Sequence, residues 1–366
     1  MSGLDALVEE ANRQFTLCNA CRYCEGYCAA FPAMELRTAF GAGDISYLAN
    51  LCYDCRACYQ ACPFTDPHEF AINIPALMSE GRLRTYERYA RPGWLRRGFT
   101  SGPVVLTGLT AGALAVMFGL YLALAGVSSL GTTHTGPGSF YAAVSHMAMV
   151  VPALLLTAFG FLAAGIGLLA FWRDSGGRGR DLGNLALWLT ALREVATLRW
   201  MRGGGGDCYY PEEQHPSSVR RWMHHLVAYG FLATFAATVV AWVQETFFGS
   251  QPPYTVASAP VLLGLGGGIA IVAGCLGLVA LRMRASHRLS APAARRLDAG
   301  FVLVLLSVGV SGSALLAFRD SVAMRPLLLV HLASIVVLYL TAPYGKLIHA
   351  VYRIGATMRS AQERQR

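Results

Sequence analysis

Eight of the ten cysteines lie between residues 18 and 62, and their spacing restricts what the N-terminal part of the chain can form. They make two C-x2-C-x2-C-x3-C runs: Cys18, Cys21, Cys24 and Cys28, then Cys52, Cys55, Cys58 and Cys62, with Pro63 following. This spacing is typical of chains that hold two [4Fe–4S] clusters, where the fourth cysteine of each run ligates the other cluster. We therefore predict one cluster on Cys18, Cys21, Cys24 and Cys62, and a second on Cys52, Cys55, Cys58 and Cys28.

Zinc and disulfides are two other uses of closely spaced cysteines. Structural zinc sites usually pair two C-x2–4-C hooks, and this longer run occurs here twice. Disulfide frameworks suit small secreted domains, whereas this chain has 366 residues. The spacing favours iron–sulfur clusters over both.

The composition places much of the chain in lipid. Apolar residues make up 54% and charged residues only 14%, against about 25% charged in ordinary soluble domains. The net charge of +9 would indicate nucleic acid if the basic residues formed a stripe on a soluble domain. They fall between apolar segments instead, so no nucleic-acid partner is expected. Met1–Thr16 is polar and acidic without an apolar core, which predicts no cleavable signal peptide.

We predict an all-α protein in which a helical two-cluster ferredoxin-like domain precedes a six-helix transmembrane bundle. The cytoplasmic ferredoxin-like domain is placed at residues 1–98 and the membrane domain at 99–350, with a long cytoplasmic loop at 173–221. Residues 351–366 are expected to form a cytoplasmic tail. A basic collar, typical of the cytoplasmic membrane face, precedes the first apolar span; it consists of Arg82, Arg84, Arg88, Arg91, Arg96 and Arg97.

Each of six apolar segments is near the ~20 residues that cross a bilayer as a helix. They are predicted at about 103–126, 144–171, 223–247, 257–281, 299–318 and 326–349. The connections 127–139 and 248–256 contain no Lys or Arg, whereas 173–221 contains eight Arg and 282–298 contains five. Loops rich in Lys and Arg stay on the cytoplasmic side of the membrane. Counting the connections between spans from the first, we therefore predict that odd-numbered loops lie outside the cytoplasm and that both termini are cytoplasmic.

Ionisable residues inside a membrane span are costly and point to function. Candidate haem b ligands are His146 in the second span, His224 and His225 in the third, and His331 and His349 in the sixth. His331 and His349 are eighteen residues apart, so one continuous helix would place them on one face, roughly 27 Å apart. We predict an outer haem between His146 and His331, and an inner haem between His349 and one of His224 and His225.

Adjacent helical residues point about 100° apart, so only one of His224 and His225 can be an axial ligand. Sequence leaves that choice open, as it does the choice between one haem and two. The alternative is that these histidines only form hydrogen bonds between helices. Four polar residues are expected near the depth of the predicted inner haem: Arg220, Arg221, Tyr344 and Lys346. They either contact quinone or haem propionates or anchor the membrane interface.

With these features together, the chain resembles the tricarballylate-utilisation protein B (CitB) family over essentially its whole length. The motifs that carry the likeness are Leu17–Cys28, Leu51–Pro63 and Arg220–Leu226. The resemblance implies a multi-pass protein of the bacterial inner membrane that reoxidises the FAD of a partner tricarballylate dehydrogenase. Electrons would pass through two [4Fe–4S] clusters and haem b to a membrane quinone.

The chain is thus expected to be an oxidoreductase subunit without substrate chemistry of its own, since no paired carboxylates or nucleophile–base arrangement is apparent. Cofactors carry such chemistry, and the protein sets their spacing and potential. Three other interpretations remain: an electron-transfer anchor for a different flavin dehydrogenase or a heterodisulfide-reductase-like complex, a membrane redox sensor, and a zinc-bearing structural anchor.

Overall fold

The computed structural model describes residues 3–94, 103–211 and 215–365 and confirms the predicted all-α class, since these residues form helices and no β-strand. Arg96 and Arg97 of the predicted collar lie outside the described residues. The α-helices are α1 Gly3–Cys21, α2 Ala30–Glu35, α3 Ala42–Leu51, α4 Ala57–Ala61, α5 Ile74–Tyr89, α7 Pro103–Ala125, α8 His146–Asp174, α9 Leu185–Ala196, α10 Val219–Phe248, α11 Ala259–Arg284, α12 Pro292–Ala317, α13 Met324–Thr341 and α14 His349–Arg364. Short 3-10 helices are η1 Val127–Gly131, η2 Gly179–Gly183, η3 Arg199–Gly205, η4 His287–Leu289 and η5 Lys346–Ile348.

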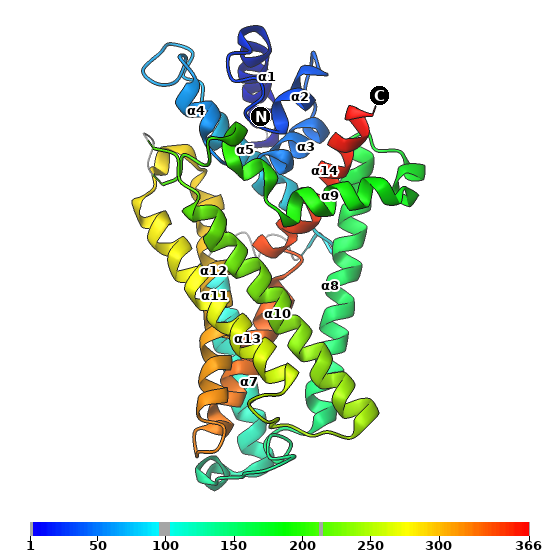
Figure 1. The fold of residues 1–366 in the computed structure, drawn as a ribbon, viewed down its shortest axis with the longest axis vertical. Helices are drawn as coiled ribbons and strands as arrows, with labels where there is room; N and C mark the ends of the chain where they lie inside the picture. The colour runs from blue at the N-terminus through cyan, green and yellow to red at the C-terminus, as the bar shows by residue number, and fades with distance from the viewer. Residues whose placement is uncertain (1–2, 95–102, 212–214, 366) are drawn as a thin grey trace.

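Helices α1 to α5 form a small N-terminal body at one end of the molecule (Figure 1). Local sequence sets where α5 begins, because the Asn73 side chain accepts a hydrogen bond from Ala76 N at 3.1 Å and Pro75 lies in the first turn. The core of this body includes Phe15, Tyr47 and Leu48, all with no exposed surface. The N-terminal domain is therefore helical, as predicted, with α2 and α3 between the two cysteine runs and α5 after them.

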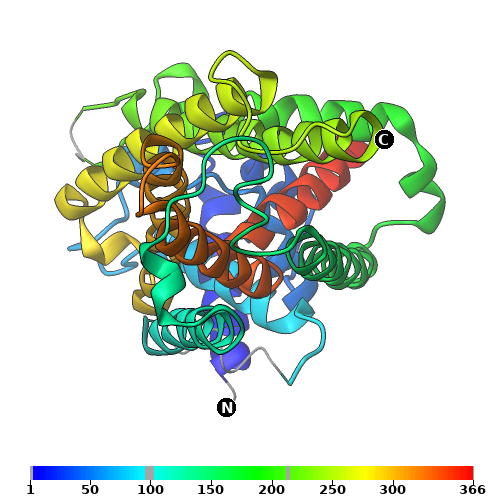
Figure 2. The same ribbon diagram turned by 90° about the horizontal axis from the view of Figure 1, so that it is seen from below.

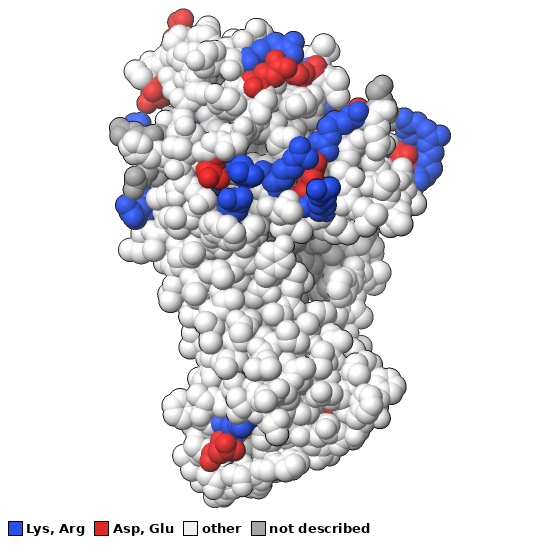
Figure 3. Space-filling model, in the orientation of Figure 1, with Lys and Arg blue, Asp and Glu red and all other residues white. Residues whose placement is uncertain are grey.

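Among the described residues, six helices are long and apolar enough to cross a membrane: α7, α8, α10, α11, α12 and α13. Their outward faces carry exposed large apolar side chains such as Leu124, Leu155 and Phe161, as lipid contact requires. On the face shown in Figure 3, Lys and Arg form a band between the N-terminal body and the bundle, and the middle of the bundle is uncharged. The predicted six-span bundle is confirmed.

The sixth span is shorter than predicted. Helix α13 ends at Thr341, and the chain turns through Ala342–Gly345 and η5 before α14 begins at His349. Pro343 explains the break, because proline donates no backbone hydrogen bond and its ring clashes with the preceding helical turn. The expectation that His331 and His349 share one face of a continuous helix was wrong, since they lie on α13 and α14.

The C-terminal residues form a packed helix rather than a free tail. Helix α14 lies beneath the N-terminal body, against α3, α8 and α9 (Figure 1). Glu363 is the main polar link, because its carboxylate accepts hydrogen bonds from Tyr47 at 2.8 Å and Arg37 at 2.7 Å and pairs with Arg359 at 3.1 Å. The predicted boundary between residues 350 and 351 falls inside this helix.

Helices α10 and α11 lie side by side along one edge of the bundle (Figure 2), and glycines allow their close approach. A Cβ at Gly267 would lie 2.7 Å from the Gly230 carbonyl oxygen, and one at Gly274 would lie 2.8 Å from the Met223 carbonyl oxygen. Small residues commonly serve this purpose between membrane helices. Within the glycine-rich stretch 264–268, Gly267 serves this packing.

Candidate functional site

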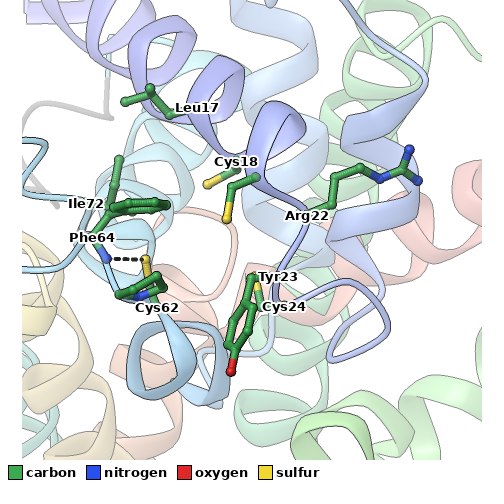
Figure 4. Close-up of a pocket in the computed structure, with 10 residues that line it drawn as sticks. Leu17, Cys18, Arg22, Tyr23, Cys24, Cys62, Phe64 and Ile72 are labelled. Carbon is green, nitrogen blue, oxygen red and sulfur yellow. Dashed lines mark hydrogen bonds between the residues drawn. The ribbon is translucent and has the colours of Figure 1, made fainter.

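The first group of cysteines surrounds a small cavity in the N-terminal body. Its lining includes the thiols predicted to share a cluster, Cys18, Cys21, Cys24 and Cys62, together with Leu17, Phe64 and Ile72. Figure 4 shows the sulfurs of Cys18, Cys24 and Cys62 on the lining of this cavity, and Cys62 Sγ accepts a hydrogen bond from Phe64 N at 3.4 Å. Cys21 is exposed, so this cavity lies near the outer surface of the body.

The second group joins Cys28 to the second run. Burial, followed by the neighbouring Cys52 thiol, raises the pKa of Cys28. Burial, followed by Cys28, raises the pKa of Cys55 and Cys58, so these four thiols lie in one neighbourhood. Cys52 Sγ accepts a hydrogen bond from Asp54 N at 3.4 Å. The structure therefore places the fourth cysteine of each run beside the other run.

The donor chemistry fits iron–sulfur clusters. Burial, followed by neighbouring thiols, raises the pKa of Cys18 to about 12 and of Cys24 to about 11, so these thiolates need the positive charge of bound iron. Among the described residues, no three His, Cys, Asp or Glu side chains converge closely enough to hold one metal ion. A cube-shaped cluster fits that arrangement because it is bound at separate corners rather than at a single centre.

The loop between α9 and α10 covers the second group, a role that sequence reasoning missed. Tyr209 N donates to the Cys55 carbonyl at 2.8 Å, and Cys208 is buried in a cluster with Cys55 and Tyr53. Gly203 has a φ of 52°, and a Cβ there would lie 3.0 Å from Ala57 and 3.7 Å from Cys55 Sγ. The glycines at 203–206 thus let the backbone of this loop approach the second cysteine group. The composition of the loop alone did not indicate this contact.

Two arginines connect this second group to the histidine-bearing helices. Arg220, in the first turn of α10, donates from Nη1 to the Asp54 carbonyl and lies 3.4 Å from the Asp54 carboxylate. Arg353, in the first turns of α14, donates from Nη2 to the Cys52 carbonyl at 3.0 Å. Each arginine is four residues from a histidine, His224 or His349, and so shares its helix face.

The structure brings His224 and His349 together. Their ring centroids are 6.0 Å apart and their planes cross at 82°. His349 Nδ1 donates to the Lys346 carbonyl at 2.5 Å, which leaves Nε2 as the free nitrogen. Burial, then the charge of Lys346, holds the pKa of His349 well below its usual range, so the ring is neutral, as a metal ligand must be.

The spacing of the two rings would suit a haem iron held by one nitrogen from each. A metal ion about 2.0 Å from one nitrogen of each ring would hold those nitrogens about 4 Å apart. Because the ring centres lie behind the nitrogens, that spacing is compatible with the 6.0 Å between the ring centroids. The hydrogen bond to Lys346 orients one ring, as partners of metal-bound histidines commonly do. His224 Nδ1 is buried without a hydrogen-bond partner among the described residues.

The other candidate histidines lie elsewhere. His225 faces Trp222 and Tyr229, with ring centroids 5.7 and 5.6 Å away. His146 Nε2 lies 3.4 Å from the Glu245 carboxylate, while His331 Nδ1 lies 3.0 Å from Ser311 Oγ. Within the described part of the chain, no contact joins His146 to His331.

These features define a class: an α-helical iron–sulfur protein with a multi-pass membrane bundle. Residues 11–88 match the family model described as Citrate utilization protein B Fer4-like domain, and residues 100–366 match Citrate utilization protein B. A relative from Escherichia coli named Citrate utilization protein B is 39% identical over 362 residues, covering 98% of this chain and 93% of its own length. The chain therefore belongs to the citrate utilization protein B family, which confirms the resemblance. No solved structure matches the chain.

Proposed function

We propose that this protein is the membrane electron-transfer subunit of an oxidoreductase. It reoxidises the reduced FAD of a partner tricarballylate dehydrogenase and passes the electrons through two [4Fe–4S] clusters and haem b to quinone. The observation that carries the proposal is the link from the second cysteine group to the His224–His349 pair through Arg220 and Arg353.

Exposure supports the order of the carriers. Electrons enter at the group of Cys18, Cys21, Cys24 and Cys62, because Cys21 is exposed and Tyr23 beside it is 69% exposed, which leaves room for a docked flavoprotein. The group of Cys28, Cys52, Cys55 and Cys58 follows, next to the bundle. Oxidation of one reduced flavin releases two electrons and two protons, and reduction of one quinone consumes the same numbers.

The bound groups supply the electron-carrying chemistry, and the chain's own residues space and shield them. His224 and His349 would hold the inner haem, with His349 oriented by the Lys346 carbonyl. Arg220 and Arg353 place positive charge beside the second cysteine group, on the helix faces that carry His224 and His349, where they would pair with haem propionates. The outer haem between His146 and His331 stays a prediction.

The same proposal includes the orientation of the protein in the membrane and the identity of its electron donor. The N-terminal body and α14 lie at the arginine-rich end of the bundle, which supports cytoplasmic termini in the inner membrane of a bacterium. The relative's name refers to citrate utilisation, and tricarballylate is a tricarboxylate without the citrate hydroxyl, so a dehydrogenase of this substrate class is the proposed donor.

The test is anaerobic purification followed by iron and haem analysis and visible spectra. About eight non-haem irons, with haem α bands that appear on reduction with dithionite, are expected. Added decylubiquinone should then reoxidise both kinds of centre. Reduced centres that stay unchanged would support the membrane redox sensor instead, and a colourless, zinc-containing preparation would rule out electron transfer.

A further inference from the structure

Helix α9 carries a row of exposed leucines. Leu185, Leu189 and Leu192 recur at the spacing of one helix face and are between 46% and 69% exposed. An exposed apolar surface of this kind commonly marks contact with a protein or a membrane. These three residues form a leucine face that is available to a partner.

The opposite face of α9 fixes the helix to the bundle. Leu187 and Ala191 are buried in one cluster with Trp172 of α8 and Met358 of α14. Figure 1 shows α9 lying crosswise to α8, at the end of the bundle nearest the N-terminal body. The buried contacts hold α9 in this position, so the leucine face stays at one level of the molecule.

A contact with α10 indicates how deep this level is. The Tyr229 hydroxyl donates to the carbonyl of Ala196, the last residue of α9, at 3.0 Å. Tyr229 lies well inside α10, which begins at Val219 and is one of the six helices long and apolar enough to cross a membrane. Tyr229 and Trp222 are both exposed on α10, and such aromatic residues are enriched at the membrane–water interface. Helix α9 therefore lies at the level of the membrane surface.

Basic residues accompany the leucine face. Arg193 lies one turn beyond Leu189, at the edge of this face, and Arg178 lies in the segment between α8 and α9; both arginines are exposed. The acidic residue of α9, Glu194, does not offset them, because it is buried and pairs with Arg364 at 3.1 Å. An apolar helix face bordered by arginine is typical of interfacial helices that bind anionic lipids.

A bilayer accounts for the depth, the apolarity and the charge of this surface together. Exposed leucines are also present near the same end of the adjoining spans, Leu169 on α8 and Leu226 on α10. The leucine face thus continues the lipid-facing surface of the bundle. A water-soluble partner would have to displace lipid head groups to reach leucines at this depth.

We propose that α9 is an interfacial helix that binds anionic phospholipid. Its leucine face lies among the acyl chains of the leaflet nearer the N-terminal body, and Arg193 pairs with a lipid phosphate at the edge of that face. Part of the segment 173–221, predicted as a cytoplasmic loop, then lies within the leaflet. The inference rests on the six-span bundle and is independent of the proposed electron transfer.

The test is photocrosslinking of the full-length protein in nanodiscs with equal amounts of phosphatidylglycerol and phosphatidylcholine. The photoreactive residue p-benzoylphenylalanine replaces Leu189 and, in two reference proteins, Leu155 on α8 or Leu36 at the end of α2, which are 66% and 64% exposed. Intact-mass analysis after illumination measures the yield of lipid adducts. The yield at position 189 should lie within about threefold of that at position 155 and about tenfold above that at position 36, because only buried acyl chains react.

The same adducts test the choice of head group. Phosphatidylglycerol should exceed phosphatidylcholine among the adducts at position 189 by about threefold, because Arg193 attracts the anionic lipid. Arg193→Gln should lower this ratio to the one found at position 155. Arg13→Gln, on α1, is the matched control and should leave the ratio unchanged.

A yield at position 189 no higher than that at position 36 would overturn the interfacial position of α9. A main product that joins two protein chains at position 189 would also overturn it and would make a second copy the occupant. Equal lipid ratios at positions 189 and 155 would overturn the binding of anionic lipid. Elution of each variant at the wild-type volume in detergent separates these outcomes from misfolding.

Discussion

Arg353 Nη2 donates a 3.0 Å hydrogen bond to the carbonyl of Cys52 while standing one helical turn beyond His349. The guanidinium also packs over the Tyr53 ring, 4.0 Å from its centroid. One side chain thus connects a proposed cluster ligand to the helix of a proposed haem ligand.

Arg353→Leu is expected to lower the reduction potential of the second cluster by tens of millivolts. Reduction adds negative charge, which the cation stabilises, and about 59 mV corresponds to 1.4 kcal/mol for one electron. An electron paramagnetic resonance titration of the purified protein measures the shift. Arg13→Leu, an exposed arginine on α1, is the control and should leave both clusters unchanged; an unshifted potential in Arg353→Leu would contradict the link.

His224→Leu and His349→Leu are each expected to abolish the inner haem, because one remaining imidazole cannot supply both axial bonds. His225→Leu should keep it, since His225 packs against Trp222 and Tyr229 rather than His349. Haem content per chain, measured from the reduced visible spectrum, checks all three variants. Haem loss in His225→Leu together with retention in His224→Leu would reverse the assignment.

In the proposed assignment, the fourth cysteine of each run ligates the cluster held by the other run. This assignment predicts which cluster each cysteine substitution removes. Cys62→Ala should lose the cluster near the outer surface, and Cys28→Ala should lose the cluster whose potential depends on Arg353. Each variant should retain about four of eight irons. Cys208→Ala is the control with all eight, because its thiol lies 3.5 Å from Arg220 Nη1 and belongs to neither proposed ligand set. Loss of the opposite clusters would show that each run binds its own.

Glu363→Ala is expected to destabilise the protein by about 3 kcal/mol, because it leaves Arg37 and Arg359 without their buried carboxylate. Glu10→Ala breaks an exposed pair with Arg13 and should cost less than about 1 kcal/mol. Thermal unfolding followed by intrinsic fluorescence in detergent compares the two. Equal stabilities would mean that α14 contributes little to holding the N-terminal body.

The sequence alone was enough for features that depend on local spacing or on summed hydropathy. The two cysteine runs predicted the grouping of Cys18 with Cys62 and of Cys28 with Cys52, because the reach of a short run limits which sulfurs can share a cluster. The six spans were found because each must satisfy its backbone hydrogen bonds within lipid, which demands a long apolar helix. The pairing of an inner histidine with His349 was also anticipated.

The tertiary structure decided what depends on contacts between distant segments. It turned His224 rather than His225 toward His349, broke the sixth span before His349, and packed α14 beneath the N-terminal body. It also laid the glycine run at Gly203 against Cys55, which no local signal marked. The physical reason is that helix rotation and loop placement are set by side-chain packing between segments, whereas hydropathy and motif spacing report only what neighbours in the chain can do.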